Sequence, residues 1–350
     1  MKKRNKTLAL ILCLTVILTS VLTACGRKEP NPTTSPMAES TNETTSSNQN
    51  TNSKAEYAVI LKTLSNDFWA TMKEGIEEEA KKHGITVDIF AANSEEDTEG
   101  QLRILENCIA KGYKAIGVAP LSPTNLINGI VQANQKGIYI MNIDEKIDME
   151  TLKSAGGSVI GFATTDNEDV GKKGAEYIIK KLEDEGGEVA IIEGKAGNAS
   201  GEARKQGATK AFENADKIKL VGSQPADWDR QKALDTAASL IQKHPDLKAI
   251  YCCNDTMALG ALQAVKNADK EGEIIIVGTD GAAEALQSIK DDELDATVAQ
   301  DSAKIGAVSF QQMLKAVSEG GEISPENEPE TLDVDSYIVD DDYFDKEEND

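Results

Sequence analysis

Short apolar runs alternate with longer amphipathic stretches from residue 57 to about residue 317. The first run, YAVIL at 57–61, precedes a stretch in which Met72, Ile76 and Ala80 recur at every fourth residue and which ends at Gly84. Apolar runs of about five residues predict buried strands, and apolar positions spaced by four predict one face of a helix. Each amphipathic stretch is followed by another apolar run, so the pattern predicts a repeating strand–helix unit.

The expected elements cover the whole globular part of the chain. Strands are expected at 57–61, 86–90, 115–119, 138–143, 159–163, 188–192, 218–223, 249–253, 274–278 and 296–299. Helices are expected at 68–83, 98–111, 124–136, 167–185, 201–215, 230–243, 256–268, 282–289 and 303–317. Strands that are apolar throughout suit a parallel sheet covered on both faces, so we expect an α/β fold with two doubly wound lobes joined by short crossovers.

The amino-terminal segment departs from this pattern. Four basic residues among the first six precede an apolar run over 8–18, which is typical of a signal peptide and is shorter than a membrane span of about 20 residues. The stretch LTAC at 22–25 resembles a bacterial lipobox. We therefore expect a lipoprotein signal peptide over 1–24 and lipidation of Cys25, with an uncleaved anchor helix as the alternative.

The segments that flank the globule are polar. Residues 25–54 are rich in Ser, Thr, Asn, Gln and Pro, and 27–54 contain no Leu, Ile, Val or aromatic residue. Such a segment cannot bury enough apolar surface to offset its ordering entropy, so we expect a disordered tether that holds the globule at a membrane. Residues 340–350 are mostly acidic, and we expect a solvated tail there.

Composition excludes several function classes. The 350 residues hold 37 Lys and Arg against 60 Asp and Glu, a net charge of −23, and such a surface repels phosphate backbones, so no nucleic-acid partner is expected. Two histidines leave little for acid–base or metal chemistry. The chain contains no GxxxxGK[ST], HExxH, GxSxG or GxGxxG motif, so we expect no catalysis, no cofactor and no metal.

The cysteines inside the globule are Cys108, Cys252 and Cys253. The adjacent pair lacks the spacing of metal ligands, and successive residues of a strand face opposite sides of a sheet. We expect all three to be packed in cores.

Polar and aromatic residues follow the ends of the apolar runs, where ligands of open parallel sheets bind. They are Lys62, Asn66, Phe68, Trp69, Asp144, Glu145, Asn198, Arg204, Trp228, Asn254, Asp280 and Gln300. Carboxylate, amide and guanidinium groups can pair with adjacent hydroxyls, and aromatic faces suit the C–H patches of a pyranose. The alternatives are helix capping by the Asp and Asn residues, an ordinary surface charge for Arg204, and interlobe packing for the tryptophans.

Seven stretches resemble the type I periplasmic sugar-binding proteins of ABC importers, and most closely the allose-binding members of that family. They are YAVILKTLSNDFW (57–69), NIDEKIDM (142–149), GGEVAIIEGKAGNASGEAR (186–204), SQPADWDR (223–230), IYCCNDTMALG (251–260), VGTDG (277–281) and ATVAQ (296–300). The resemblance covers 55–339 and implies two lobes, joined by three crossovers, with a sugar in the cleft. The implied lobes are 55–164 plus 301–332 and 165–300 plus 333–339.

The resemblance also implies residue roles. Asn66 and Asp144 match hydroxyl binders of the first lobe, Phe68 and Trp228 match stacking faces with Trp69 beside them, and the second lobe contributes Arg204, Asn254, Asp280 and Gln300. Lys62 and Asn198 follow the allose-type pattern, whereas ribose binders have a small hydroxyl residue at the position of Lys62. Asp67 departs from the proline common at its position.

We therefore expect the substrate-binding lipoprotein of an ABC sugar importer, monomeric and anchored by lipid at the extracytoplasmic face of the membrane. It is expected to bind a monosaccharide, a D-allose-like hexose first, and to deliver it to a permease by hinge closure. Another aldose such as ribose, or sugar sensing for a signalling or chemotaxis receptor, remains open. A regulator of the lactose-repressor type shares the fold but needs a helix-turn-helix where residues 1–54 hold a signal and a tether.

Overall fold

A sheet of six parallel strands forms the first lobe, in the order β11-β5-β4-β3-β1-β2. The computed structural model describes residues 55–183 and 185–347. The strands of this lobe are β1 Tyr57–Leu61, β2 Val87–Ala91, β3 Ala115–Val118, β4 Tyr139–Ile143, β5 Gly161–Thr164 and β11 Glu330–Asp333. Its helices are α1 Asp67–Lys82, α2 Thr98–Lys111, α3 Ile127–Gln135, α4 Met149–Ser154 and α10 Ser302–Glu319.

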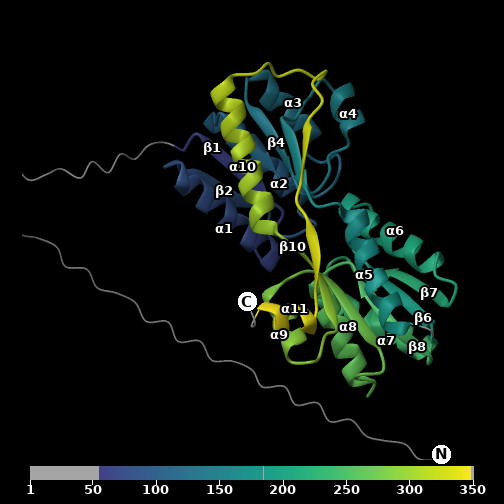
Figure 1. Cartoon of the computed structure of the whole chain (residues 1–350). Coiled ribbons are helices and arrows are strands. Elements are labelled where there is room, and N and C mark those ends of the chain that lie inside the picture. Colours follow the sequence, from purple (N-terminus) through teal and green to yellow (C-terminus); the bar gives the residue numbers. More distant parts are fainter. Residues whose placement is uncertain (1–54, 184, 348–350) are drawn as a thin grey trace, which may run out of the picture. The chain divides into compact units, whose positions relative to one another are not determined.

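A second six-stranded sheet forms the second lobe, in the order β12-β10-β9-β8-β6-β7, and only β12 is antiparallel to its neighbour. The strands are β6 Gly187–Glu193, β7 Ile218–Pro225, β8 Leu247–Cys252, β9 Ile275–Asp280, β10 Ala296–Gln300 and β12 Ser336–Val339. The helices are α5 Asn167–Leu182, α6 Ala199–Glu213, α7 Arg230–Lys243, α8 Asp255–Asn267, α9 Ala283–Lys290 and α11 Asp341–Glu347. Figure 1 shows the helices of each lobe packed around its sheet.

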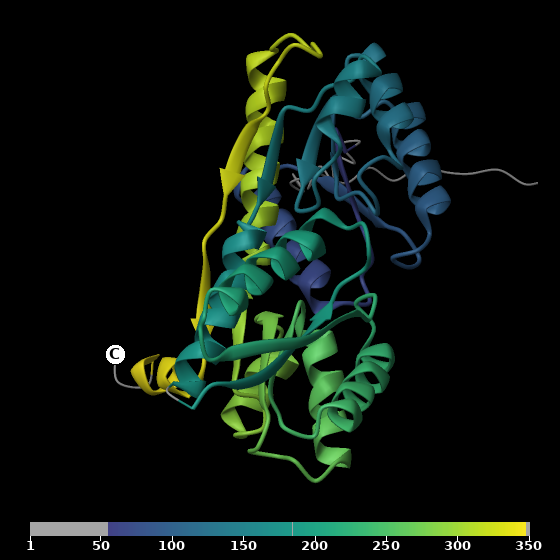
Figure 2. The ribbon, with the colours of Figure 1, turned by 90° about the vertical axis from the view of Figure 1, so that its right-hand side faces the viewer.

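Three crossovers join the lobes. The chain leaves the first lobe between β5 and α5, returns between β10 and α10, and leaves again between β11 and β12. Figure 2 shows the third crossover as the yellow segment that runs along one side from the first sheet to the second. The two doubly wound lobes and the three crossovers confirm the fold expected from the strand–helix pattern and from the family resemblance.

The strands carry apolar side chains on both faces because helices cover both faces of the sheets. In β1, Tyr57, Val59 and Leu61 pack in one cluster with side chains of α1 and α10, whereas Ala58 and Ile60 pack in another with side chains of α2 and α3. Successive residues of a strand face opposite sides, so a sheet between two helical layers needs apolar residues at every position.

The cysteines inside the globule are core residues, as expected. Cys252 and Cys253 are fully buried in the core of the second lobe, and Cys108 is a buried residue of α2 in the first. All three thiols are free. Burial raises the pKa of Cys253 to about 12, so it stays an unreactive thiol at neutral pH.

Two local expectations differ from the structure. The helix expected from 124 begins only at Ile127, because Ser122 and Asn125 hydrogen-bond to each other's backbone N–H groups in a turn. The apolar pattern also missed β11 and β12, which are strands of only four residues at the edges of their sheets. Each has only four residues, ETLD and SYIV, which is too short for a clear apolar run.

The expectation of a solvated tail from 340 is wrong for α11. Residues 341–347 form a helix, and Phe344 packs against the core of the second lobe. Lys290 lies over the ring of Phe344, with 4.5 Å between Nζ and the ring centroid, and Tyr343 stacks on Tyr337. Contacts of Tyr343 and Phe344 therefore place this segment on the second lobe.

The expected signal peptide, the lipidated Cys25 and the tether over 25–54 lie outside the described residues, as do the last three residues of the tail. In the part of the chain that is described, no helix is both long and apolar enough to cross a membrane.

Candidate functional site

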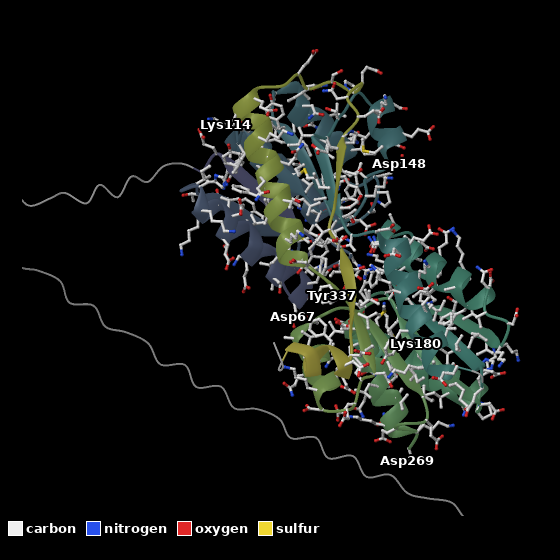
Figure 3. The ribbon with its side chains drawn as sticks, in the orientation of Figure 1. Asp67, Lys114, Asp148, Lys180, Asp269 and Tyr337 are labelled. Carbon is white, nitrogen blue, oxygen red and sulfur yellow. The ribbon has the colours of Figure 1, made fainter. Side chains whose placement is uncertain are left out.

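Side chains of both lobes line one cavity. They are Lys62, Asn66, Phe68, Trp69, Glu95 and Asp144 from the first lobe, and Ser200, Arg204, Trp228, Asn254 and Asp280 from the second. The space between the lining atoms is about 380 Å³ with its open side included. Asp67, labelled in Figure 3, begins α1 where the first lobe faces the second, whereas Lys114 and Asp269 mark the outer parts of the two lobes.

The lining residues gather because the strands of each sheet are parallel. Lys62 follows β1 directly, Asp144 follows β4 and Asn254 stands two residues beyond β8, while Asp280 is the last residue of β9. Carboxyl ends of parallel strands meet at one edge of a sheet, and in open α/β sheets ligands bind beyond that edge. Here the carboxyl edges of the two sheets contribute to one cavity.

Lys62 forms a buried ion pair with Glu145, with 2.9 Å between Nζ and Oε2. Both side chains are almost fully buried. Burial alone would lower the pKa of Lys62, but the Glu145, Glu95 and Asp144 carboxylates reverse this and raise its pKa. The ammonium also lies 5.5 Å from the ring centroid of Trp69. Lys62 is therefore a fixed cation in the cavity wall.

Asp144 is the buried carboxylate of the first lobe. It is 4% exposed, and its Oδ1 accepts no hydrogen bond from any described residue. Its backbone is in the left-handed region at φ 59°, which Asp adopts more readily than most residues. Burial raises the pKa of Asp144 to about 7, opposed by Lys62 and Arg204. The group needs a hydrogen-bond donor from outside the described residues.

Arg204 organises the wall of the second lobe. Its Nε donates to Asn167 Oδ1 at 2.8 Å, and its Nη1 donates to the Cys253 carbonyl at 2.7 Å and to Asp280 Oδ1 at 3.3 Å. Gln300 Nε2 donates to the same Asp280 oxygen at 2.7 Å. These contacts orient the Asp280 carboxylate. Burial raises the pKa of Asp280, and Arg204 opposes that rise.

Three aromatic side chains complete the cavity. Phe68 and Trp69 meet edge to face, with 5.0 Å between ring centroids, on the first lobe. Trp228 belongs to the second lobe and lies close to Gly194, where an added Cβ would come within 2.0 Å of the indole ring. The absence of a side chain at Gly194 therefore makes room for the ring.

Helix capping was the alternative role for the strand-end residues, and two of them both cap a helix and line the cavity. Asn66 accepts from the Phe68 N–H at 2.9 Å and caps α1, and Asn254 accepts from the Met257 N–H at 2.9 Å and caps α8. Both also line the cavity. Asp144 and Asp280 cap no helix, so capping does not explain them.

Three of the expected site residues do not line the cavity but bond to residues that do. Glu145 pairs with Lys62, and Gln300 donates to Asp280. Asn198 accepts from Trp228 Nε1 at 3.0 Å and donates across the cleft to the Leu121 carbonyl at 3.3 Å. They hold lining residues in place.

Two lining residues were missed from the sequence. Glu95 stands four residues beyond β2, in the polar loop before α2, and Ser200 is the second residue of α6. The strand-end rule could have found Glu95 had it been applied to the run at 86–90. Ser200 carries no such signal, because its position depends on how α6 approaches the first lobe.

Two buried acceptors of the cavity lining, Glu95 Oε2 and Asp144 Oδ1, have no partner among the described residues. Gln300 Oε1, behind the lining, is a third buried acceptor without a partner among them. Buried polar atoms are rarely left unsatisfied, so these acceptors fit a ligand that carries several hydroxyl groups. The described residues contain no group of three His, Cys, Asp or Glu side chains that could hold a metal ion.

Two lobes of this topology with a polar cleft between them define a binding protein of the periplasmic type. The family model described as "Periplasmic binding protein domain" matches residues 57–322. The chain therefore belongs to this family, as its resemblance predicted.

Individual relatives agree with this family assignment. The D-allose-binding periplasmic protein of Escherichia coli K12 is 58% identical over 285 residues, which are 81% of this chain and 92% of that protein. The ribose import binding protein RbsB of Bacillus subtilis is 34% identical over 88% of this chain and 92% of its own length. A solute-binding protein of Actinobacillus succinogenes, solved with bound D-allose, superposes with a TM-score of 0.78 at 32% identity, covering 84% of this chain and all of that one.

Proposed function

We propose that this chain is the substrate-binding protein of an ABC importer and that its cavity takes one monosaccharide, with D-allose as the first candidate. The observation that carries the proposal is the placement, around one cavity, of the unpaired Asp144 of the first lobe and the Arg204–Asp280 pair of the second. Phe68 and Trp228 add aromatic faces for the C–H surface of a sugar ring.

The mechanism is hinge closure. The three crossovers are the only covalent connections between the lobes in the described residues. A ligand that contacts both lobes stabilises the closed form, because only there are both sets of contacts made. The closed form is then the state that a permease recognises, and the sugar leaves unchanged.

D-allose ranks before ribose for two reasons. The D-allose-binding relative is 58% identical, against 34% for the ribose-binding relative of B. subtilis. Lys62, which marks the allose-type pattern, stands in the cavity wall as a buried cation.

A thermal-shift screen over aldohexoses, pentoses and their epimers tests the ligand. A ligand of the native state raises the melting temperature with its concentration, and calorimetry then gives the dissociation constant. We expect D-allose to give the largest shift. A larger shift with ribose or another aldose would replace D-allose as the ligand, and no shift with any monosaccharide would contradict the proposal.

We also propose that Cys25 carries a lipid that anchors a monomeric protein at the extracytoplasmic face of the cell membrane. The lipobox-like LTAC stretch and the polar tether support this. Cys25→Ser should abolish incorporation of labelled palmitate into the protein in a bacterial host. Cys13→Ser, in the expected signal peptide, is the matched control and should still incorporate the label; labelling of the Cys25 variant would contradict a lipid at Cys25.

A further inference from the structure

Glu95 brings a third carboxylate into the cavity, from the loop that follows β2. It lies between β2 and α2 and lines the cavity with Lys62 and Trp69. The Trp69 side chain lies beside the Glu95 carboxylate, whose Oε2 is buried and has no partner among the described residues. The neighbouring Glu96 is exposed. Only one of these two adjacent carboxylates therefore belongs to the cavity.

The backbone of Glu95 is held by the opposite lobe. Lys195, in the loop between β6 and α6, donates from Nζ to the Glu95 carbonyl at 2.6 Å. This contact crosses the cleft, so the loop that carries Glu95 is fixed when the lobes are together. A ligand group bound to the Glu95 carboxylate would then meet an acceptor positioned from both lobes.

The charges around the cavity favour an uncharged ligand. Lys62 and Arg204 face three lining carboxylates, those of Glu95, Asp144 and Asp280, and Lys62 is already paired with Glu145 outside the lining. An anionic ligand would add negative charge beside these carboxylates in a buried site, where such repulsion is weakly screened. Hydroxyl groups instead bring the hydrogen atoms that the unpaired oxygens need.

We propose that Glu95 is a specificity-determining residue of this site: its free oxygen accepts a hydroxyl hydrogen of the bound monosaccharide and makes the cavity prefer neutral sugars to their acids. The inference rests on the proposed function and extends it to a residue and a ligand class. It places the hydroxyl that Glu95 binds near Lys62 and Trp69, on the side of the first lobe.

The test compares Glu95→Gln with Glu96→Gln by calorimetry. The parent sugar is the best ligand of the screen, and its monodeoxy analogues and its uronic acid complete the set. Loss of a hydrogen bond to a charged group lowers affinity by about tenfold or more, so we expect Glu95→Gln to weaken binding of the parent sugar by that factor. Glu96→Gln should change it less than about twofold, as expected of an exposed residue. Melting curves of the free variants establish that both fold.

The deoxy analogues separate direct contact from indirect effects. One analogue, lacking the hydroxyl that Glu95 binds, should bind wild type about tenfold more weakly than the parent sugar and should lose little more in Glu95→Gln. The affinity for the uronic acid, relative to the affinity for the parent sugar, should be higher in Glu95→Gln than in wild type.

Three results would overturn the proposal. These are unchanged binding of the parent sugar by Glu95→Gln, equal losses for every deoxy analogue in both proteins, and a uronic acid that binds wild type as tightly as the neutral sugar. If wild type binds no monosaccharide, the proposed function falls and the role of Glu95 falls with it; unchanged binding by the variant overturns the role of Glu95 alone.

Discussion

Glu145 of the first lobe accepts a 2.7 Å hydrogen bond from Ser200 Oγ of the second. Its other oxygen accepts from the backbone N–H groups of Ala199 and Ser200, at the amino end of α6. A carboxylate is stabilised there by the free N–H groups and by the helix dipole. Glu145 thus joins the lobes by its own contacts, and the same carboxylate holds Lys62 in the cavity wall.

We predict that Ser200→Ala weakens sugar binding by about tenfold, because it removes a hydrogen bond to a charged group that exists only with the lobes together. The population of open molecules should rise in small-angle scattering or in fluorescence energy transfer between labelled lobes. Ser288→Ala is the control, since Ser288 is buried in α9 of the same lobe, outside the cavity lining. Equal closure by wild type and Ser200→Ala would refute the interlobe role of Glu145.

Arg204→Ala and Asp280→Ala should each reduce sugar affinity by about a hundredfold. Each leaves its partner buried without its counter-charge and removes a charged hydrogen-bonding group from the cavity. Calorimetry with the best sugar of the screen measures the loss. Arg230→Ala, which removes an exposed ion pair with Glu284, should bind as wild type does. Wild-type affinity in both site variants would show that the sugar binds elsewhere.

Sugar binding should strengthen from pH 5 to pH 8. Burial raises the pKa of Asp144 from its ordinary 3.8 to about 7 in the free protein. If sugar hydroxyls donate to the ionised carboxylate, binding lowers that pKa and releases a proton. Calorimetry near pH 6.5 in buffers of different ionisation enthalpy measures the number of protons released on binding.

The stability of the sugar-free protein should change with pH in the opposite direction. A carboxyl with a raised folded-state pKa contributes stability below its unfolded value and loses it as pH rises through the folded value, so the melting temperature should fall between pH 5 and pH 8. Asp144→Asn should weaken both pH dependences, while Asp269→Asn, an exposed residue of the second lobe, should keep them. Proton uptake on binding would contradict the ionised form of Asp144.

Gly194→Ala should lower sugar affinity by about tenfold or more while Gly321→Ala leaves it unchanged. A Cβ at Gly194 would lie 2.0 Å from the ring of Trp228, so the indole must move, whereas nothing lies within 4 Å of a Cβ at Gly321. The chain has two tryptophans and both line the cavity, so intrinsic fluorescence reports both the displacement of Trp228 and sugar binding. An altered spectrum with unchanged affinity would show that Trp228 does not contribute to sugar binding.

Much of the site could be predicted from the order of elements. The carboxyl ends of parallel strands share an edge, so residues that follow separate apolar runs, such as Lys62, Asp144 and Asp280, were expected to meet, and they do line one cavity. The same rule could not separate a lining residue from one behind it. Glu145 follows Asp144 directly, yet it faces the amino end of α6 instead of the cavity.

The sequence by itself determined the two doubly wound lobes, because an uninterrupted apolar strand can be buried only between two helical layers. It also determined which strand ends carry polar groups. Tertiary structure alone decided what those groups contact: that Glu145 reaches Ser200, that Glu95 keeps an unpaired oxygen, and that Phe344 packs an acidic segment onto the second lobe. These contacts depend on how closely surfaces from different parts of the chain approach each other. That distance is set by packing between residues far apart in the sequence.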